Sequence, residues 1–485
     1  MHDSEENVMK RNYDIAVIGA GIGGLTAGAL MASKGYSVAV FEAGHVPGGY
    51  CTSFRRHGFM FDSCLDAISG WGEDGWLRRV FRKLDIEEKI EMVRLDPLRV
   101  DNFAGDKVNV PGSIPELMNL LCGIAPGEKD GILNLLDTME EIYRIAMSTP
   151  PEILYGHYGT RGIIWKYREK TYKELLDEFI ANPKARAVMC DRCAFLGLPP
   201  SKVSALAMTV MFMAYSSGGG YRIKGGARNL TDALVKALFG NGGELHLNTP
   251  VSDVMIEDGK ACGVAVPGGK ILAKAVIAAA DAAAMCRMAG TDSVANKASI
   301  SFYMVYLGLR GAPEIPDSMG YYPGYDIEST FADVAMDVAS PNASLEIINY
   351  SGLSPAMAPG GHTSVMLMSK AEYSYSRPWN ECRDYEAEKV LSLAEKAIPG
   401  ITESVVFRET ATPLTLEKYT GNLRGAAFGW EQNVSNARIS SRTRLPGLFF
   451  AGHWTYPGGG IESVAASGLA AAEGAAAVIN KEAFN

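Results

Sequence analysis

Residues 13–42 read YDIAVIGAGIGGLTAGALMASKGYSVAVFE, and this stretch decides the fold of the amino-terminal part of the chain. Residues 13–18 form a short apolar run with β-branched members, which is typical of a buried parallel strand. Gly19, Gly21 and Gly24 follow at the spacing G-x-G-x-x-G, before a helical segment and a second apolar run at residues 37–41. This order of strand, glycines, helix and strand predicts a dinucleotide-binding βαβ unit.

Each glycine of the motif has a physical task. We expect Gly19 to permit the tight turn out of the strand, Gly21 to let the backbone approach a pyrophosphate, and Gly24 to let the helix pack closely on the sheet. The amino terminus of the helix offers free N–H groups to phosphates. Glu42 ends the second apolar run, where a carboxylate can accept the ribose hydroxyls of an adenosine.

A second glycine pair, Gly48-Gly49, lies in the segment AGHVPGGYCTSFRRHGFMFD at residues 43–62. This segment resembles the amino terminus of the phytoene desaturase, carotenoid isomerase and retinol saturase family of flavoproteins. In that family the second glycine pair lies against the diphosphate and ribityl chain of FAD. The resemblance therefore implies FAD as the resident cofactor.

Two later blocks extend the resemblance. Residues 218–281 read as loop, helix and strands, with a hairpin turn at Asp258-Gly259. Residues 445–479, LPGLFFAGHWTYPGGGIESVAASGLAAAEGAAAVI, read as a strand, a glycine-rich loop and a small-residue helix whose amino terminus can stabilise negative charge on a reduced flavin. The motifs and the resemblance together predict cofactor contacts at Gly19, Gly21, Ile22, Gly23, Gly24, Glu42, Ala43, Gly48, Gly49, Gly225, Gly226, Val251, Gly452, His453, Gly460 and Ile461.

We predict an α/β protein with two interleaved domains. A Rossmann-like FAD-binding domain, similar to those of glutathione reductase and amine oxidases, comprises residues 1–75, 218–290 and 411–485. An α+β substrate domain comprises residues 76–217 and 291–410. Strand-like runs at 300–310, 343–350 and 363–368 predict a mixed sheet in it. Helical patterns cover residues 113–123, 128–147, 171–195, 200–215, 228–239 and 380–396, and Ser113 with Glu116 predicts a capping box.

Composition excludes several classes of protein. A chain of 485 residues with 47% hydrophobic and 21% charged residues has an ordinary balance for a protein with more than one core. The formal charge of −9 argues against a nucleic-acid scaffold. We expect no membrane-spanning helix and no secretory signal, because the first residues are polar and no long apolar run occurs. The scattered cysteines form no disulfide framework, which predicts a cytoplasmic location.

Two features leave alternatives open. Residues 76–84 show a helical period with a basic face, which indicates either a surface helix of the core or a peripheral contact with the cytoplasmic face of a membrane. Cys190-Asp-Arg-Cys193 is a C-x-x-C pair, and we favour two ordinary thiols over a redox dithiol or half a metal site. We expect Asp191 and Arg192 between them to be a solvated pair on the surface. The dispersed histidines predict no metal centre.

The candidate catalytic residues are His453 and Glu462, which flank the glycine-rich loop expected beside the flavin. For His453, cofactor contact or packing is the alternative. The helix with Met208 and Met211 suits a hydrophobic substrate tunnel, although ordinary core packing is the favoured explanation for any single methionine. Tyr419 and Trp430 are expected to line the cavity near the ring, where aromatic side chains can sandwich a conjugated substrate.

The resemblance implies an FAD-dependent oxidoreductase that acts on carbon–carbon double bonds of a hydrophobic, isoprenoid or carotenoid-like small molecule. Desaturation, saturation and reduced-flavin isomerisation share this framework, with NADH or NADPH as a candidate electron donor. The segment GGYCTSFRRHGFMFD at residues 48–62 and the block PLTLEKYTGNLRGAAFGWEQ at residues 413–432 look more like the isomerase and saturase branch than the bacterial desaturase branch. An amine-oxidase-like flavoenzyme acting on a small polar substrate is the alternative, and a non-enzymatic isoprenoid carrier ranks last.

Overall fold

The protein is described by a computed structural model over residues 11–149, 162–288, 290, 296–437 and 439–483. Its first sheet is built around β1 (Asn12–Ile18), which pairs in parallel with β2 (Val38–Phe41) and β12 (Gly269–Ala278). The strand order is β10-β11-β12-β1-β2-β9, and β18 pairs with β12 to give seven strands. The other strands of this sheet are β9 (Glu244–His246), β10 (Asp253–Glu257), β11 (Lys260–Val266) and β18 (Leu448–Phe450).

Chain segments far apart in sequence thus meet in one sheet, as the sequence predicts. The hairpin between β10 and β11 turns at Asp258 and Gly259, whose φ angles of 48° and 72° are the left-handed values that such a tight turn requires.

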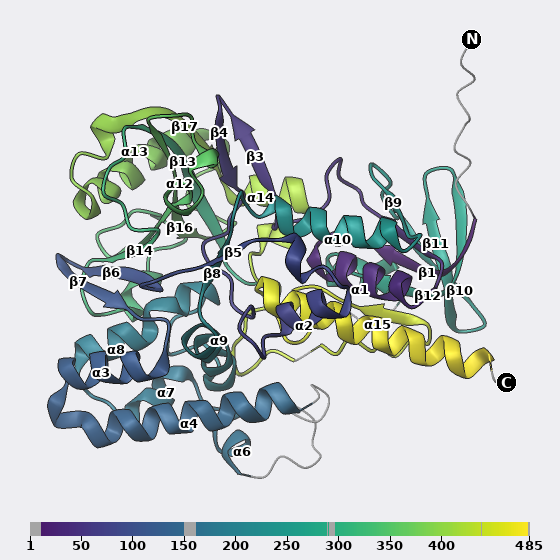
Figure 1. Ribbon diagram of the computed structural model, residues 1–485, viewed down its shortest axis with the longest axis horizontal. Helices are drawn as coiled ribbons and strands as arrows, with labels where there is room; N and C mark the ends of the chain where they lie inside the picture. Colours follow the sequence, from purple (N-terminus) through teal and green to yellow (C-terminus); the bar gives the residue numbers. More distant parts are fainter. Residues whose placement is uncertain (1–10, 150–161, 289, 291–295, 438, 484–485) are drawn as a thin grey trace.

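Helices cover this sheet to form the first lobe, at the right of Figure 1. The helices are α1 (Ile22–Ser33), α2 (Trp76–Lys83), α10 (Arg228–Gly240) and α15 (Ile461–Ala483), and α11 (Ala282–Met288) lies beside β10. α1 packs between α10 and α15, so nearly all of its residues are buried. This complete burial explains why the segment after the glycine motif is apolar on every face.

α15 is long and apolar enough by composition to cross a membrane, which the sequence analysis did not anticipate. However, 56% of that apolar window is buried inside the protein, where α15 packs against α1 and α2. Its apolar character is therefore accounted for as a core helix of the first lobe.

The second sheet has seven strands in the order β17-β13-β16-β15-β14-β6-β7. β14 pairs with β6 in parallel and the other neighbours pair antiparallel, so this sheet is mixed, as predicted. The strands are β6 (Arg99–Phe103), β7 (Asp106–Val110), β13 (Ser301–Arg310), β14 (Ser318–Tyr322), β15 (Leu345–Asn349), β16 (His362–Ala371) and β17 (Val405–Ala411). The strand-like runs predicted at 300–310, 343–350 and 363–368 are confirmed.

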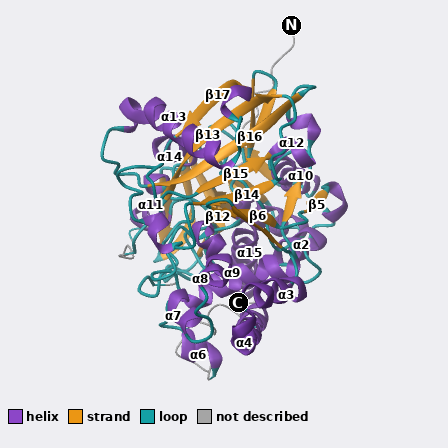
Figure 2. Cartoon of the chain, turned by 90° about the vertical axis from the view of Figure 1, so that its left-hand side faces the viewer, coloured by secondary structure: helices purple, strands orange, loops and turns teal. Residues whose placement is uncertain are grey.

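In the second lobe, helices pack against one face and one end of this sheet. α13 (Trp379–Ala397) covers one face, and a helical bundle packs against the β6, β7 and β14 end. The bundle consists of α3 (Ile114–Ile124), α4 (Lys129–Ser148), α6 (Ile163–Tyr167), α7 (Tyr172–Asp177), α8 (Pro183–Cys190) and α9 (Ala205–Gly218). Figure 2 shows the bundle gathered below the strands. Smaller elements are β3 (Ser53–Arg56), β4 (Phe59–Asp62), β5 (Met92–Arg94), β8 (Tyr221–Ile223), α12 (Tyr350–Leu353) and α14 (Pro413–Thr420). The exact domain boundaries stay a prediction.

The capping box predicted at Ser113 is wrong. The Ser113 hydroxyl donates to the Glu116 carboxylate at 2.5 Å and does not accept from the backbone of α3, so the reciprocal arrangement does not form. α9 also begins later than predicted, at Ala205, because Ser204 provides its amino-terminal cap.

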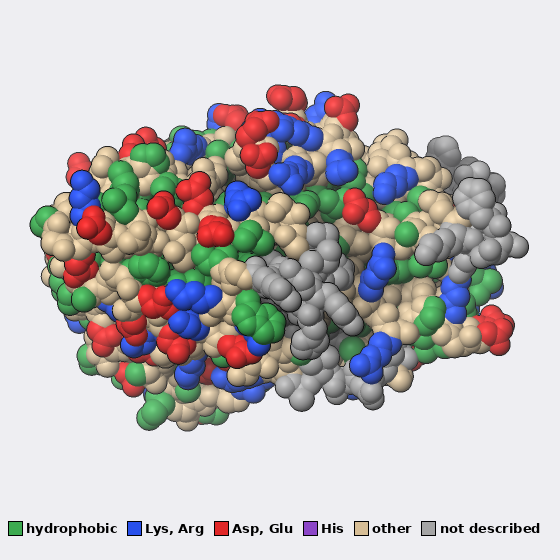
Figure 3. All heavy atoms as spheres, turned by 90° about the horizontal axis from the view of Figure 1, so that it is seen from below, with side chains coloured by type: hydrophobic (Ala, Val, Ile, Leu, Met, Phe, Trp, Pro, Cys, Tyr) green, Lys and Arg blue, Asp and Glu red, His purple; other side chains and the backbone are tan. Residues whose placement is uncertain are grey.

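The basic helix α2 lies on the surface with its apolar face buried. Its arginines pair with nearby carboxylates, Arg78 and Arg82 with both Glu73 and Glu87. The protein thus neutralises much of this basic face itself, which favours the surface-helix interpretation over membrane contact. On the face drawn in Figure 3, Lys and Arg side chains are likewise interspersed with Asp and Glu.

The prediction that Asp191 and Arg192 form a solvated surface pair is also wrong. Both lie in the 3₁₀ turn Asp191–Phe195 and each is only 1% exposed. They belong to a buried ion cluster, because Arg192 Nε donates to Asp191 at 2.9 Å and Arg99 of β6 approaches the same carboxylate at 3.9 Å. Cys190 and Cys193 are buried free thiols beside it.

Candidate active site

A cavity of about 1450 Å³ begins at the carboxyl ends of β1 and β2 and continues between the two lobes. Ile18 and Phe41, the last residues of those strands, lie in its wall. The crevice outside the carboxyl ends of parallel strands is where open α/β sheets bind ligands.

Glycine backbone bounds the cavity where the first helix begins. A Cβ atom added at Gly21, Gly452 or Gly460 would meet no protein atom within 4 Å, and all three residues line the cavity. Gly49 is similar, since its only close neighbour would be the Cα of Gly21 at 3.6 Å. These bare backbone positions surround space that a phosphate-bearing ligand can enter next to the amino termini of α1 and α15.

The other glycines of the first motif serve packing. A Cβ at Gly19 would lie 2.6 Å from the carbonyl oxygen of Ala279, and one at Gly24 would lie 2.0 Å from that of Gly19. Gly23 lines the cavity and lets α1 approach Gly452, whose nitrogen would be 2.8 Å from its Cβ. Gly24 itself does not line the cavity; its close approach to the strand is the packing role predicted for it.

Glu42 lies at the end of the cavity next to β2, as its position directly after that strand predicts. Its carboxylate accepts N–H groups of Ala20 and Gly44, both at 2.7 Å. These bonds fix the carboxylate and leave lone pairs that can accept ribose hydroxyls. Ala43 and Val251 line the same end, and Ile22, Gly48 and Ile461 also contribute to the wall.

The contact predicted for Gly225-Gly226 is corrected by the structure, because neither residue lines the cavity. A Cβ at Gly226 would lie 2.7 Å from Ser53 Oγ and 2.9 Å from Asp62 Oδ1. The loop therefore supports the β3-β4 hairpin from behind, and the next residue, Ala227, donates its N–H to Asp62.

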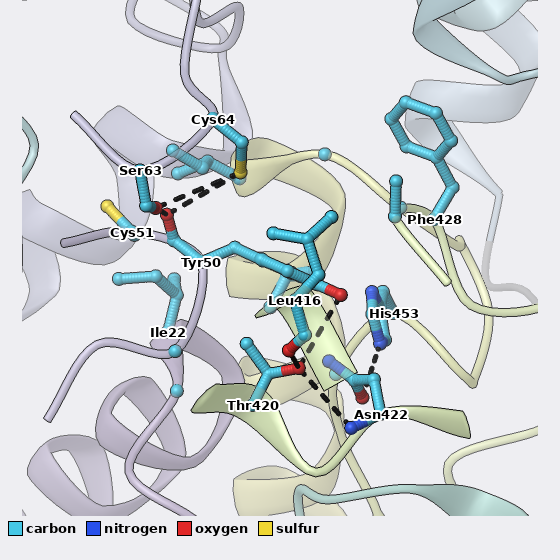
Figure 4. A pocket seen from close by; sticks show the side chains of 18 of the residues that line it. Ile22, Tyr50, Cys51, Ser63, Cys64, Leu416, Thr420, Asn422, Phe428 and His453 are labelled. Carbon is cyan, nitrogen blue, oxygen red and sulfur yellow. Dashed lines mark hydrogen bonds between the residues drawn. The ribbon is translucent and has the colours of Figure 1, made fainter. Parts of the chain in front are cut away.

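His453 lines the cavity and is held by Asn422 (Figure 4). The Asn422 Oδ1 atom accepts from Trp454 Nε1 at 2.8 Å and lies 3.0 Å from His453 Nε2. Since the indole N–H can only donate, it fixes the orientation of the amide. His453 Nε2 must then carry the imidazole proton, and Nδ1 keeps its lone pair.

Burial keeps this imidazole neutral. Loss of hydration lowers the pKa of His453 from 6.5 to about 4, and a contact with the Ala427 backbone opposes this only weakly. Tyr50 lies beside it, with ring centroids 5.8 Å apart, and its hydroxyl donates to the Ala426 carbonyl at 3.0 Å. Burial also raises the pKa of Tyr50. A neutral, oriented imidazole can accept or hold a proton at Nδ1, which suits either proton relay or cofactor contact.

A pH-dependent stability is expected from His453. Between pH 6.5 and about 4 the unfolded chain protonates this histidine and the folded protein does not, so stability falls as the pH falls through this window. The His453→Gln variant should lack this contribution, worth up to about 3 kcal/mol. Urea unfolding of both proteins at the two ends of the window measures the difference; an equal acid loss in both would contradict the assignment.

Glu462, the second catalytic candidate, also lines the cavity but at a different place. It is 8% exposed, accepts the Ser69 hydroxyl at 2.7 Å and accepts the N–H of Trp76 at 3.2 Å. Burial raises the pKa of the Glu462 carboxyl against these two hydrogen bonds. No hydrogen bond among the described residues links Glu462 to His453.

Of the four residues predicted to line the substrate cavity, two line it and two do not. Met211 lines the cavity, and Tyr419 lines its mouth with 63% of its surface exposed. Met208 does not reach the cavity, because it is fully buried against Cys193. Trp430 does not reach it either and packs edge-on against Trp454 at 4.7 Å, so it supports the Asn422 contact from behind.

Sequence reasoning missed Asn422, Tyr50 and the segment that holds Glu462. Tyr50 directly follows the second glycine pair, which is a signal that could have found it. Asn422 stands in a block that the resemblance marked, but only tertiary structure shows that its amide sits between His453 and Trp454.

Comparison with solved structures first establishes the class of fold. Putrescine oxidase bound to putrescine superposes with a TM-score of 0.67 at 17% identity, covering 97% of this chain and 99% of that one. An oxidoreductase from Methanosarcina mazei superposes with a TM-score of 0.65 at 17% identity, covering 95% and 99%. The protein has an amine-oxidase-like flavoprotein fold with mixed sheets.

Residues 22–476 match the family described as flavin-containing amine oxidoreductase, and the chain belongs to this family. It is similar to prolycopene isomerase 1 of an Oncidium hybrid cultivar, 24% identical and covering 97% of this chain and 85% of that protein. It is also similar to the neurosporene-forming phytoene desaturase of Rhodobacter capsulatus, 24% identical over 93% of this chain and 92% of that protein. The bare glycine backbone and the fixed Glu42 carboxylate fit a flavin dinucleotide.

Proposed function

We propose that the protein is an FAD-dependent oxidoreductase that acts on carbon–carbon double bonds of a hydrophobic, isoprenoid or carotenoid-like substrate. The observation that carries this proposal is the shape and chemistry of the cavity beyond the glycine loops. It continues into a sheet arm, lined by Phe54, Phe302, Tyr306, Met368 and Phe428, and into a bundle arm, lined by Tyr143, Met147, Phe195, Val210 and Met211. A large, predominantly apolar space suits an elongated apolar molecule.

The residues of the chain bind, orient and exclude water. Gly21, Gly49 and Glu42 would hold the dinucleotide, and the amino terminus of α15 would face its flavin end. Bound flavin supplies hydride transfer to or from carbon. His453, kept neutral by burial and oriented by Asn422, would hold its proton at Nε2 beside the reacting region, while the aromatic walls of both arms exclude water.

The alternative, oxidation of a small polar amine, would need carboxylates free to bind an ammonium group. Two acids of the cavity wall are already paired with arginine: Asp66 with Arg222 at 3.0 Å and Glu409 with Arg56 at 3.0 Å. Glu462 and Asp281 are further acids of the cavity wall that this alternative could use. The apolar walls and the curated relatives support the isoprenoid proposal instead.

An anaerobic titration of the FAD-reconstituted protein tests the proposal. We expect NADH, NADPH or a phytoene-like polyene to bleach the visible flavin band, and putrescine to leave it unchanged. Bleaching by a nicotinamide donor followed by a change in polyene products supports saturation or reduced-flavin isomerisation, whereas bleaching by the polyene itself supports desaturation. Bleaching by putrescine, or failure to bind FAD, would overturn the proposal.

A further inference from the structure

The bundle arm contains the carboxyl group of Glu462, which a glycine-rich segment of the chain encloses closely. Glu462, at the start of α15, is held from one side by residues 69–76, which carry the sequence SGWGEDGW. A Cβ at Gly70 would lie 2.4 Å from Glu462 Cδ, and one at Gly75 would lie 2.1 Å from the Gly70 carbonyl oxygen. Only a glycine-rich segment can therefore wrap this carboxyl group so closely, with Gly70 at a left-handed φ of 80°.

The two hydrogen bonds to Glu462 come from neutral donors, the Ser69 hydroxyl and the Trp76 backbone. This distinguishes it from Asp66 and Glu409, which face arginines. Arg79 forms its ion pair with Asp74, and its more distant charge lowers the pKa of the Glu462 carboxyl less than burial raises it. Burial therefore favours the protonated carboxyl group, which has a proton to donate as well as lone pairs to accept with. The raised pKa of Glu462 is consistent with this state.

The surroundings of Glu462 in the bundle arm are otherwise apolar or aromatic. Trp76, Tyr143, Ala207, Met211 and Tyr215 line this part of the cavity. A carboxyl group in a largely apolar arm can fix the orientation of a ligand that has one polar end, because the few polar groups of such pockets provide specificity.

From this geometry, and resting on the proposed function, we infer that Glu462 binds the hydroxyl end of an elongated isoprenoid alcohol in the bundle arm. The substrate would then be an isoprenoid with an uncharged oxygen at one end, and a pure hydrocarbon would bind less well. Glu462 acts here as a specificity-determining residue.

Binding of matched ligands to the flavin-loaded protein tests the inference, with the shift of the flavin spectrum as the readout. The ligands are farnesol, its hydrocarbon counterpart farnesene and farnesylamine. We expect farnesol to bind about tenfold more tightly than farnesene, since one buried hydrogen bond is worth about that factor. Glu462→Leu should abolish this preference, whereas Glu462→Gln, which imitates a neutral carboxyl group, should retain most of it.

The matched control is Glu473→Leu, on an exposed position of the same helix, which should bind all three ligands like the natural protein. If Glu462→Leu does not fold, Ala207→Phe, which fills the bundle arm from α9, should lower farnesol affinity while leaving flavin content unchanged.

Four outcomes would overturn the inference. Equal binding of the three ligands to the natural protein would leave the proposed function standing but remove the hydroxyl site. Tightest binding of farnesylamine, lost in Glu462→Gln, would show an ionised carboxylate that binds ammonium. Equal weakening of all ligands in Glu462→Leu would assign Glu462 to holding residues 69–76 alone. Absence of binding by any ligand would contradict the proposed function as well.

Discussion

Gly21→Val is expected to abolish flavin binding while the protein still folds. Gly21 has φ −69° and ψ 174°, an extended conformation that valine adopts readily, and its added Cβ would meet no protein atom within 4 Å. The new side chain would instead extend into the cavity beside the amino terminus of α1, where the backbone must approach the diphosphate. We expect flavin affinity to fall by at least about 100-fold, or ~3 kcal/mol.

Flavin content measured by visible absorbance after incubation with excess FAD, together with a thermal melt without flavin, separates binding from folding. Gly123→Val is the matched control, because Gly123 is an exposed residue of α3 whose added Cβ also meets nothing within 4 Å. Full flavin content in Gly21→Val would show that the cofactor does not pass this glycine. An unfolded Gly21→Val protein would show that the position is structural.

Arg99→Leu is expected to lower the free energy of unfolding of the protein more than any substitution on its surface. Arg99 is 2% exposed, and it donates to Asp101 at 2.8 Å and to Glu346 of β15 at 2.7 Å. With Asp191 at 3.9 Å it also links the second sheet to the bundle. Removing one partner of such a buried cluster leaves charges without compensation and costs about 3–5 kcal/mol.

The pH dependence of this loss has a definite sign. Burial raises the pKa of Asp101 to about 8 against the pull of Arg99, and without the arginine this carboxyl group is expected to hold its proton still more strongly. A carboxyl group whose pKa is raised on folding loses its stabilising contribution as the pH rises through the folded value. The defect of Arg99→Leu should therefore be greatest at alkaline pH.

Urea unfolding of the two proteins measures this prediction, with Arg408→Leu as the control. Arg408 lies in the same sheet and pairs with Glu388 at 2.6 Å on the surface, where such a pair contributes about 0–1 kcal/mol. A loss in Arg99→Leu no larger than in Arg408→Leu would contradict the role of the cluster.

The candidate site was predictable at positions where the backbone geometry requires a particular residue type, such as glycine. Gly19, Gly21 and Gly24 could be assigned separate tasks because turn, close approach and helix packing each exclude a side chain. The resemblance placed Gly225-Gly226 near the cofactor, but neither residue lines the cavity, since a glycine that lets a hairpin pack looks identical in sequence to one that faces a ligand. Met208 and Met211 differ in the same way: only the orientation of α9 decides which reaches the cavity.

By itself the sequence determined the βαβ unit, the return of residues 218–281 and of the carboxy terminus to the first sheet, and the main strands of the second. Local periodicity and turn chemistry act over a few residues, so they can be read along the chain. Only the tertiary structure decided that Asp191 and Arg192 are buried, that Asn422 orients His453, and that residues 69–76 enclose Glu462. Each of these contacts joins residues that are far apart in the sequence. A local sequence pattern cannot predict which charged or hydrogen-bonding groups become neighbours when the two lobes fold.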